Sequence, residues 1–342
     1  WSDKSCRWEI FVGTNRGLWD DATGTPNANR VLDHPQYGRA EVTIPRKPRD
    51  KTASLPGLPW RKNRDGDQPA TTVDSGPLSS AEFLTGVCDQ LERSRQGDLL
   101  LFVHGFNVRF DEAVICAAQL ALKMPFNGAV VTYAWPTQGG VFNYDEDEPI
   151  NKASVAPFME FLQTLRAGIP AQTRITILVH SMGNRIVMDA LDQMPSPSGE
   201  KPISQVVLCA PDVGRKDFER WAPGVLDQSE RVALYSNASD SALIVSKGKH
   251  AESRAGDAWH PVLVPGIEVV DCSRVDLTMM GHSYFGENED VQTDLFMLIK
   301  EQRSADKRPH LERRENETGA TYWSFQHSAP AIYCTWHFDE RE

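Results

Sequence analysis

Short apolar runs that alternate with amphipathic segments constrain this chain more than any other feature. Residues 98–103, DLLLFV, form an almost continuous apolar run, as in a strand that is buried on both faces. The segment that follows, FDEAVICAAQLALKM at 110–124, begins with acidic residues and spaces its apolar residues by three and four, which predicts a helix. Such alternation indicates an α/β fold, with a mostly parallel sheet and helices on both faces.

The same alternation extends over most of the chain. Further strands are predicted at 9–15, 40–45, 129–136, 173–181, 204–211, 231–237 and 267–273, and further helices at 79–95, 153–168 and 184–194. The polar segment 45–78, rich in Pro and Gly, is predicted to be a surface excursion. We expect residues 1–300 to form one α/β domain and residues 301–342 to be an extension that packs on it.

Charge and hydropathy exclude some classes of partner. The 342 residues include 36 basic and 47 acidic ones, a formal net charge of −11, and no cluster of Lys and Arg. This balance argues against nucleic acid as a partner. No run of about 18 apolar residues occurs, so the sequence predicts no transmembrane helix. It does not indicate an oligomeric state.

The cysteines favour a reducing compartment. Six of them lie far apart, at positions 6, 88, 116, 209, 272 and 334, and none forms a C-x-x-C pair. Cys116 and Cys209 fall inside apolar runs and are expected to be buried free thiols. The sequence therefore favours a cytoplasmic location, while one bridge among Cys6, Cys272 and Cys334 remains open.

Polar residues follow the carboxyl ends of several predicted strands. Ligands of a parallel sheet bind at these strand ends. Ser181 comes directly after one strand, Asp240 follows the strand at 231–237, and His282 lies beyond the last strand beside Gly281. A serine, an acid and a histidine in this order match the triad of the α/β-hydrolase fold. The sequence therefore predicts Ser181 as nucleophile, His282 as base and Asp240 as the acid that orients it.

Alternatives to these assignments stay open. Ser181 would also suit the role of a helix N-cap, because Ser is a favoured cap residue. Asp212, after the strand at 204–211, is the alternative acid, and Asp276 is a weaker third. Val179 stands two residues before Ser181, where a nucleophile elbow usually has Gly, which implies a wider turn or a small residue opposite.

A loop after the strand at 98–103 supplies the remaining part of a hydrolase site. Acyl transfer places negative charge on a carbonyl oxygen, which fixed backbone N–H groups stabilise. The N–H groups of Met182 and of Phe106, which follows Gly105, are the predicted oxyanion hole. His104 is expected to orient this loop.

Several blocks of the sequence resemble one family. They are LFVHGFNVRFDEAV, AWPTQGGVFNYDEDE, LVHSMGNRIVMDAL, LCAPDVGRKDF, LYSNASDSAL and GHSYF, between about residues 8 and 300. They are similar to the bacterial α/β-hydrolases of unknown function, which are esterase- or lipase-like. The resemblance implies the α/β-hydrolase fold for residues 1–300 and a serine-nucleophile hydrolase, with the nucleophile at Ser181, the base at His282 and the oxyanion loop at Gly105 and Phe106.

The expected function is hydrolysis of small carboxylic esters through an acyl-enzyme, without a cofactor or metal. An amidase or an acyltransferase would use the same residues. Two further hypotheses are a metal hydrolase with zinc on His104, His180 and His282, and a binding module that retains the fold without catalysis.

Other residues are expected to lie around the site. The possible pocket residues follow strand ends and are His104, Gly105, Asn107, Trp135 and Tyr144. Segment 136–152 is a possible cover. The acidic run YDEDEP at 144–149 is interpreted as a solvated loop rather than a cation site.

Overall fold

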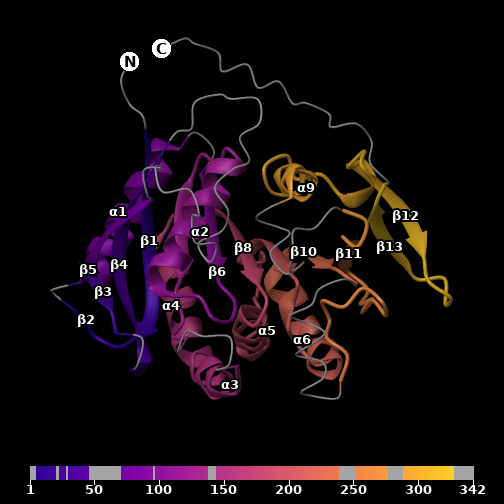
Figure 1. The fold of residues 1–342 in the computed structure, drawn as a ribbon, viewed down its shortest axis with the longest axis horizontal. Coiled ribbons are helices and arrows are strands. Elements are labelled where there is room, and N and C mark those ends of the chain that lie inside the picture. Colours follow the sequence, from indigo (N-terminus) through magenta and orange to yellow (C-terminus); the bar gives the residue numbers. More distant parts are fainter. Residues whose placement is uncertain are drawn as a thin grey trace, which may run out of the picture.

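The computed structural model describes residues 5–20, 23–27, 30–45, 71–94, 97–137, 144–238, 252–275 and 288–326. Within these ranges, one large sheet runs through the molecule (Figure 1). From one edge to the other, its strands are β12 (Leu311–Glu315), β13 (Thr321–Phe325), β11 (Ile267–Asp271), β10 (Ser229–Ser236), β9 (Ile203–Cys209), β8 (Arg174–His180), β6 (Asp98–Val103), β7 (Ala129–Tyr133), β1 (Ser5–Arg16), β4 (Val31–Pro45) and β5 (Thr72–Leu78). Strands β2 (Trp19–Asp20) and β3 (Thr25–Pro26) form a small separate hairpin.

The centre of the sheet is parallel. From β13 through to β1, every pair of neighbouring strands is parallel. The antiparallel pairs of this sheet, as far as the structure describes it, are β1–β4, β4–β5 and β12–β13. The carboxyl ends of the parallel strands therefore meet at one edge. The predicted mostly parallel sheet is confirmed.

Helices cover both faces of the sheet. They are α1 (Ser80–Arg93), α2 (Phe110–Lys123), α3 (Tyr144–Ala153), α4 (Val155–Gly168), α5 (Gly183–Gln193), α6 (Arg215–Gln228) and α9 (Glu289–Ile299). The apolar residues of α2 and α9 share one buried cluster, and those of α1, α4, α5 and α6 share the other. The predicted helices at 79–95, 110–124, 153–168 and 184–194 are thus confirmed within a few residues.

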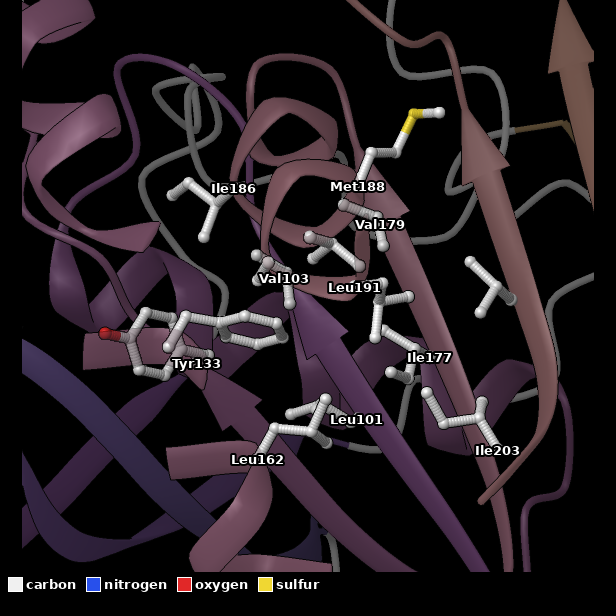
Figure 2. Close-up of a cluster of buried hydrophobic side chains, with 14 of the residues drawn as sticks. Leu101, Val103, Tyr133, Leu162, Ile177, Val179, Ile186, Met188, Leu191 and Ile203 are labelled. Carbon is white, nitrogen blue, oxygen red and sulfur yellow. The ribbon is translucent and has the colours of Figure 1, made fainter. Parts of the chain in front are cut away.

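The alternation of side chains along a central strand explains its continuous apolar sequence. In β6, Leu99 and Leu101 belong to the cluster under α5, whereas Leu100 belongs to the cluster under α2. Figure 2 shows the cluster under α5, with Leu191 of α5 close to Ile177 of β8. Because successive side chains of a strand point to opposite faces, a strand between two helical layers has no solvated position.

The prediction for segment 45–78 is wrong in part. Its last seven residues form β5, which pairs with β4 from Tyr37↔Leu78 to Thr43↔Thr72. An edge strand needs backbone hydrogen bonds on one side only, so polar residues, Gly and Pro are tolerated there. Residues 46–70 lie outside the described part of the chain.

Residues beyond 300 contribute two strands to the same sheet. Strand β13 pairs with β11, and β12 completes the edge at the right of Figure 1. Residues 327–342 lie outside the described residues.

A buried network of charged residues holds the chain beyond residue 300 against the rest of the protein. Asp294 of α9 is fully buried, and its Oδ2 accepts hydrogen bonds from the hydroxyl of Tyr235 and, at 2.5 Å, from Nη1 of Arg308. Its Oδ1 lies 2.6 Å from Nε2 of His310, and Nη2 of Arg308 donates to Glu268 at 2.9 Å. The network joins α9, β10 and β11 to the chain beyond residue 300.

We expect Asp294→Ala to destabilise the protein by about 3–5 kcal/mol, because it leaves the Arg308 guanidinium buried without its closest counter-charge. Urea unfolding followed by circular dichroism measures this. The control is Glu312→Gln, which removes a partly exposed partner of Arg274 and should change stability by about 1 kcal/mol or less. Equal, small effects of both substitutions would contradict the assigned role of the network.

Two of the cysteines and the lengths of the helices can be compared with the predictions. Cys116 and Cys209 are buried free thiols, and burial raises the pKa of Cys116 to about 12. Cys334 lies outside the described residues. Among the helices in the described ranges, none has the length and apolarity to span a membrane.

Candidate active site

Ser181 lies on a sharp turn between β8 and α5, at the edge where the parallel strands end. Its φ is 52°, in the left-handed region that a residue with a side chain rarely adopts. The N-cap of α5 is Met182, whose side chain makes no capping hydrogen bond, so Ser181 does not occupy the cap position of this helix. A strained serine between strand and helix is the geometry of a nucleophile elbow.

Hydrogen bonds to the backbone of Ser181 hold this strained conformation. Its carbonyl oxygen accepts from the backbone N–H of Asn184 at 3.1 Å, from the Asn184 side chain at 2.8 Å and from the backbone N–H of Asp212 at 3.2 Å. Its own N–H donates to the carbonyl of Cys209 at 3.0 Å. A residue in a strained conformation persists only where its surroundings determine it in this way.

Two glycines allow the elbow to approach the loop after β6. A Cβ on Gly183 would lie 2.4 Å from the carbonyl oxygen of His104, and a Cβ on Gly105 would lie 2.7 Å from the Cβ of Ser181. Neither position leaves room for a side chain. Val179, where the elbow motif usually has Gly, is completely buried under α5.

His104 and Trp135 hold the loop after β6 in place through buried contacts. The His104 ring stacks on Trp135 at 5.3 Å, and Nε1 of Trp135 donates to the His104 carbonyl at 2.8 Å. Nδ1 of His104 lies 2.8 Å from the Gly105 carbonyl and donates to it, because a carbonyl can only accept. Burial, aided by the charge of Arg16, lowers the pKa of His104 to about 3, so the ring is neutral. Both side chains are buried and support the loop.

The backbone N–H groups predicted as an oxyanion hole belong to these two adjacent turns. In the described part of the chain, neither the N–H of Met182 nor that of Phe106 donates a hydrogen bond to another residue. Met182 is buried, and the Phe106 ring lies 5.4 Å from the ring of Tyr144. Asn107, next in the loop, has φ 55° and closes the turn.

Asp212 lies beside Ser181 in a buried ion-pair network. Its Oδ2 accepts from the hydroxyl of Tyr144 at 2.5 Å and from Nη2 of Arg185 at 3.2 Å. Its Oδ1 lies 3.3 Å from Nε of Arg254. Nη1 of Arg185 binds Glu148 at 2.6 Å. The carboxylate of Asp212 therefore pairs with two guanidinium groups at the edge of the site, and Glu148 supplies a second negative charge for Arg185.

The interpretation of residues 144–149 as a solvated loop is wrong. They form the first part of α3, in which Asp147 and Asn151 are buried. The helix lacks an apolar stripe because much of the face that it turns toward the protein is polar, which explains why its sequence resembles a loop.

Several predicted site residues cannot be placed. Asp240, Asp276, Gly281 and His282 lie outside the described residues, as do residues 138–143 of the possible cover. Within the described ranges, no group of three or more His, Cys, Asp or Glu is arranged to hold a metal ion. His104 and His180 both lie near Gly105, and Nδ1 of His180 would be 3.0 Å from a Cβ there.

Three of the polar residues that sequence reasoning missed are buried and support the turns beside Ser181. Arg16 donates from Nη2 to the Val108 carbonyl at 2.9 Å, and burial lowers its pKa to about 10. Asn184 holds the carbonyl of Ser181, and Asn151 donates to the carbonyl of Met182 at 3.1 Å. Only Asn184, three residues after the predicted nucleophile, is close enough in sequence to have been found.

A family model described as "Alpha/beta hydrolase of unknown function (DUF900)" matches residues 79–302, more than half of the chain. The chain belongs to this family. The family resemblance and the α/β-hydrolase fold predicted from the sequence are thereby confirmed. The matched range contains β6, β8, α3 and α5, and hence every described residue of the site except Arg16.

Several solved structures are similar to this chain at low sequence identity. An esterase from Pyrococcus furiosus is 14% identical, with a TM-score of 0.35, over 61% of this chain and 83% of its own. An esterase from Pyrobaculum calidifontis is 12% identical, with a TM-score of 0.38, over 78% and 81%. Phospholipase PlaB from Legionella pneumophila is 12% identical, with a TM-score of 0.31, over 67% of each chain. No curated protein matches this chain significantly.

Proposed function

We propose that this α/β hydrolase is a serine hydrolase that cleaves small carboxylic esters through an acyl-enzyme on Ser181. The observation that carries the proposal is the left-handed φ of Ser181 on a strand–turn–helix, with the Gly105 loop packed against its Cβ. A helix cap does not require this conformation, whereas a nucleophile that must project from the sheet does.

The proposed mechanism assigns the base to His282 and the acid to Asp240. His282 takes the proton of Ser181 Oγ as this oxygen adds to the ester carbonyl carbon. The carbonyl oxygen becomes an oxyanion, which the N–H groups of Met182 and Phe106 stabilise. The tetrahedral intermediate then collapses, and the alcohol leaves with the proton that His282 returns.

Water completes the cycle. It adds to the acyl carbon while His282 accepts its proton, and the acid leaves as Ser181 regains a proton. Asp240 holds the tautomer of His282 and stabilises its charged form. The buried, neutral His104 takes no proton in these steps, because its pKa of about 3 lies far below that of an ordinary imidazole.

Partitioning of the acyl group tests the proposal. p-Nitrophenyl butyrate and phenyl butyrate, hydrolysed in the presence of hydroxylamine, should give the same ratio of butyrohydroxamate to butyrate, since both form the same butyryl-enzyme. The rates should not change after dialysis against a chelator. A ratio that depends on the leaving group would contradict the acyl-enzyme, and loss of rate on chelation would favour the metal hypothesis. Faster turnover of the matching amide would identify an amidase.

A further inference from the structure

Helix α3 presents a polar face to the nucleophile elbow. Tyr144, Glu148 and Asn151 are spaced by four and three residues, so they lie along one side of the helix. Tyr144 donates at 2.5 Å to Asp212, whose backbone N–H binds the Ser181 carbonyl, and Asn151 donates at 3.1 Å to the carbonyl of Met182. Glu148 accepts at 2.6 Å from Arg185, in the first turn of α5.

The same face contacts both segments that carry the oxyanion donors. At one end of α3, the Tyr144 ring lies 5.4 Å from the Phe106 ring, at a tilt of 60°. At the other end, Nδ2 of Asn151 donates to the carbonyl of Met182 at 3.1 Å. The helix therefore bridges the loop after β6 and the turn after β8, which come from separate parts of the chain.

Arg185 secures the middle of this bridge. Its guanidinium binds Glu148 of α3 at 2.6 Å, the Tyr144 hydroxyl at 2.7 Å and the Asp212 carboxylate at 3.2 Å. Burial alone would lower the pKa of Arg185, but Asp212, Tyr144 and Glu148 raise it overall, so the group stays charged. Since Arg185 lies in the first turn of α5, the ion pairs fix α3 relative to the start of that helix.

We propose that α3 sets the separation of the two oxyanion donors, with Tyr144 and Asn151 as positioning residues for the N–H groups of Phe106 and Met182. This inference rests on the proposed serine hydrolase function. Because oxyanion donors act only when they are fixed before the charge develops, small displacements of either donor should slow the chemical step. Substrate affinity in the ground state should change little.

Steady-state kinetics of the full chain with p-nitrophenyl butyrate tests this. All rates are expressed per active site, as titrated with a fluorophosphonate probe. Asn151→Ala should lower kcat by about 10- to 100-fold and leave KM within about twofold, because loss of one complete oxyanion donor costs on the order of 10²–10³. Lys152→Ala, at the next and exposed position of the helix, is the matched control and should match the wild type.

A trifluoromethyl ketone provides the second readout. Ser181 Oγ adds to its carbonyl carbon, the serine proton moves to His282, and the resulting oxyanion occupies the oxyanion hole. Its Kd should rise in Asn151→Ala by the same factor by which kcat/KM falls. Tyr144→Phe retains the ring beside Phe106 but loses the hydroxyl, and it should show the same proportionality with a smaller factor.

The outcomes separate the two proposals. If the wild type does not react with the probe, the proposed function fails, and this inference fails with it. If the wild type reacts but both variants keep wild-type kcat per titrated site and wild-type ketone affinity, only the role of α3 is overturned. If the variants have a lower melting temperature but an unchanged kcat per site, the role of α3 is also overturned, because the helix then contributes to stability alone.

Discussion

Ser181→Ala should lower the turnover of p-nitrophenyl butyrate by at least about 10⁴-fold, since removal of the nucleophile of a triad eliminates the whole covalent route. The substitution removes one oxygen and keeps a Cβ, so the far-ultraviolet circular dichroism should not change. Turnover is measured at saturating substrate against the rate in buffer.

The control for this prediction is another serine. Ser196→Ala, at an exposed position outside the site, should have wild-type turnover. If Ser181→Ala kept more than about a tenth of the wild-type rate, Ser181 would not be the nucleophile, and the strained turn would need another explanation.

Asp240→Asn should have the second largest effect, a fall in kcat of about 10⁴-fold. A triad in which Asn replaces the acid holds the histidine in the wrong tautomer and cannot stabilise its charged form. Asp212→Asn should slow the reaction far less, because the Asp212 carboxylate already pairs with Arg185 and Arg254. Its main consequence should be lower stability in urea, since the buried Arg254 and the partly buried Arg185 lose a counter-charge.

Measuring both variants under the same conditions shows whether Asp240 or Asp212 is the acid of the triad. Stopped-flow kinetics with p-nitrophenyl butyrate gives kcat, and circular dichroism verifies that each variant is folded. A folded Asp212→Asn that loses about 10⁴-fold, together with an Asp240→Asn near the wild type, would reverse the assignment.

Much of the fold follows from local patterns. Residues 99–103 are apolar throughout, and Arg174 and Thr176 are the only polar residues among 174–179, so both sequences indicate central strands without further information. The α1 helix begins where Ser79 and Glu82 form a capping box, which is also a local signal. The strands at 98–103 and 173–181 and the helix at 79–95 were predicted from local patterns of this kind.

The elements that were missed include β5, α3, α6, α9, β12 and β13. Among them, β5 and α3 are stabilised by distant partners. Strand β5 has few apolar residues, and its place depends on the edge that β4 offers. Helix α3 has a polar buried face, whose partners Arg185, Asp212 and Met182 lie 31 to 68 residues away along the chain. Hydrophobic periodicity cannot reveal a helix of this kind.

The candidate site also contains residues that the sequence identifies and residues that it does not. Ser181, Gly105 and Phe106 follow strands directly, so the order of strands brings them to one edge. Arg16 and Asn151 act from other segments and carry no motif, so only the three-dimensional arrangement reveals them.

The acyl chemistry, the base, the acid and the role of α3 all depend on one reactive hydroxyl. The full-length protein, treated with a fluorophosphonate at neutral pH and digested, should yield a single phosphonylated peptide with the modification on Ser181. Heat-unfolded protein should give no adduct. A folded protein that takes no label, or that takes it at another residue, would contradict the account.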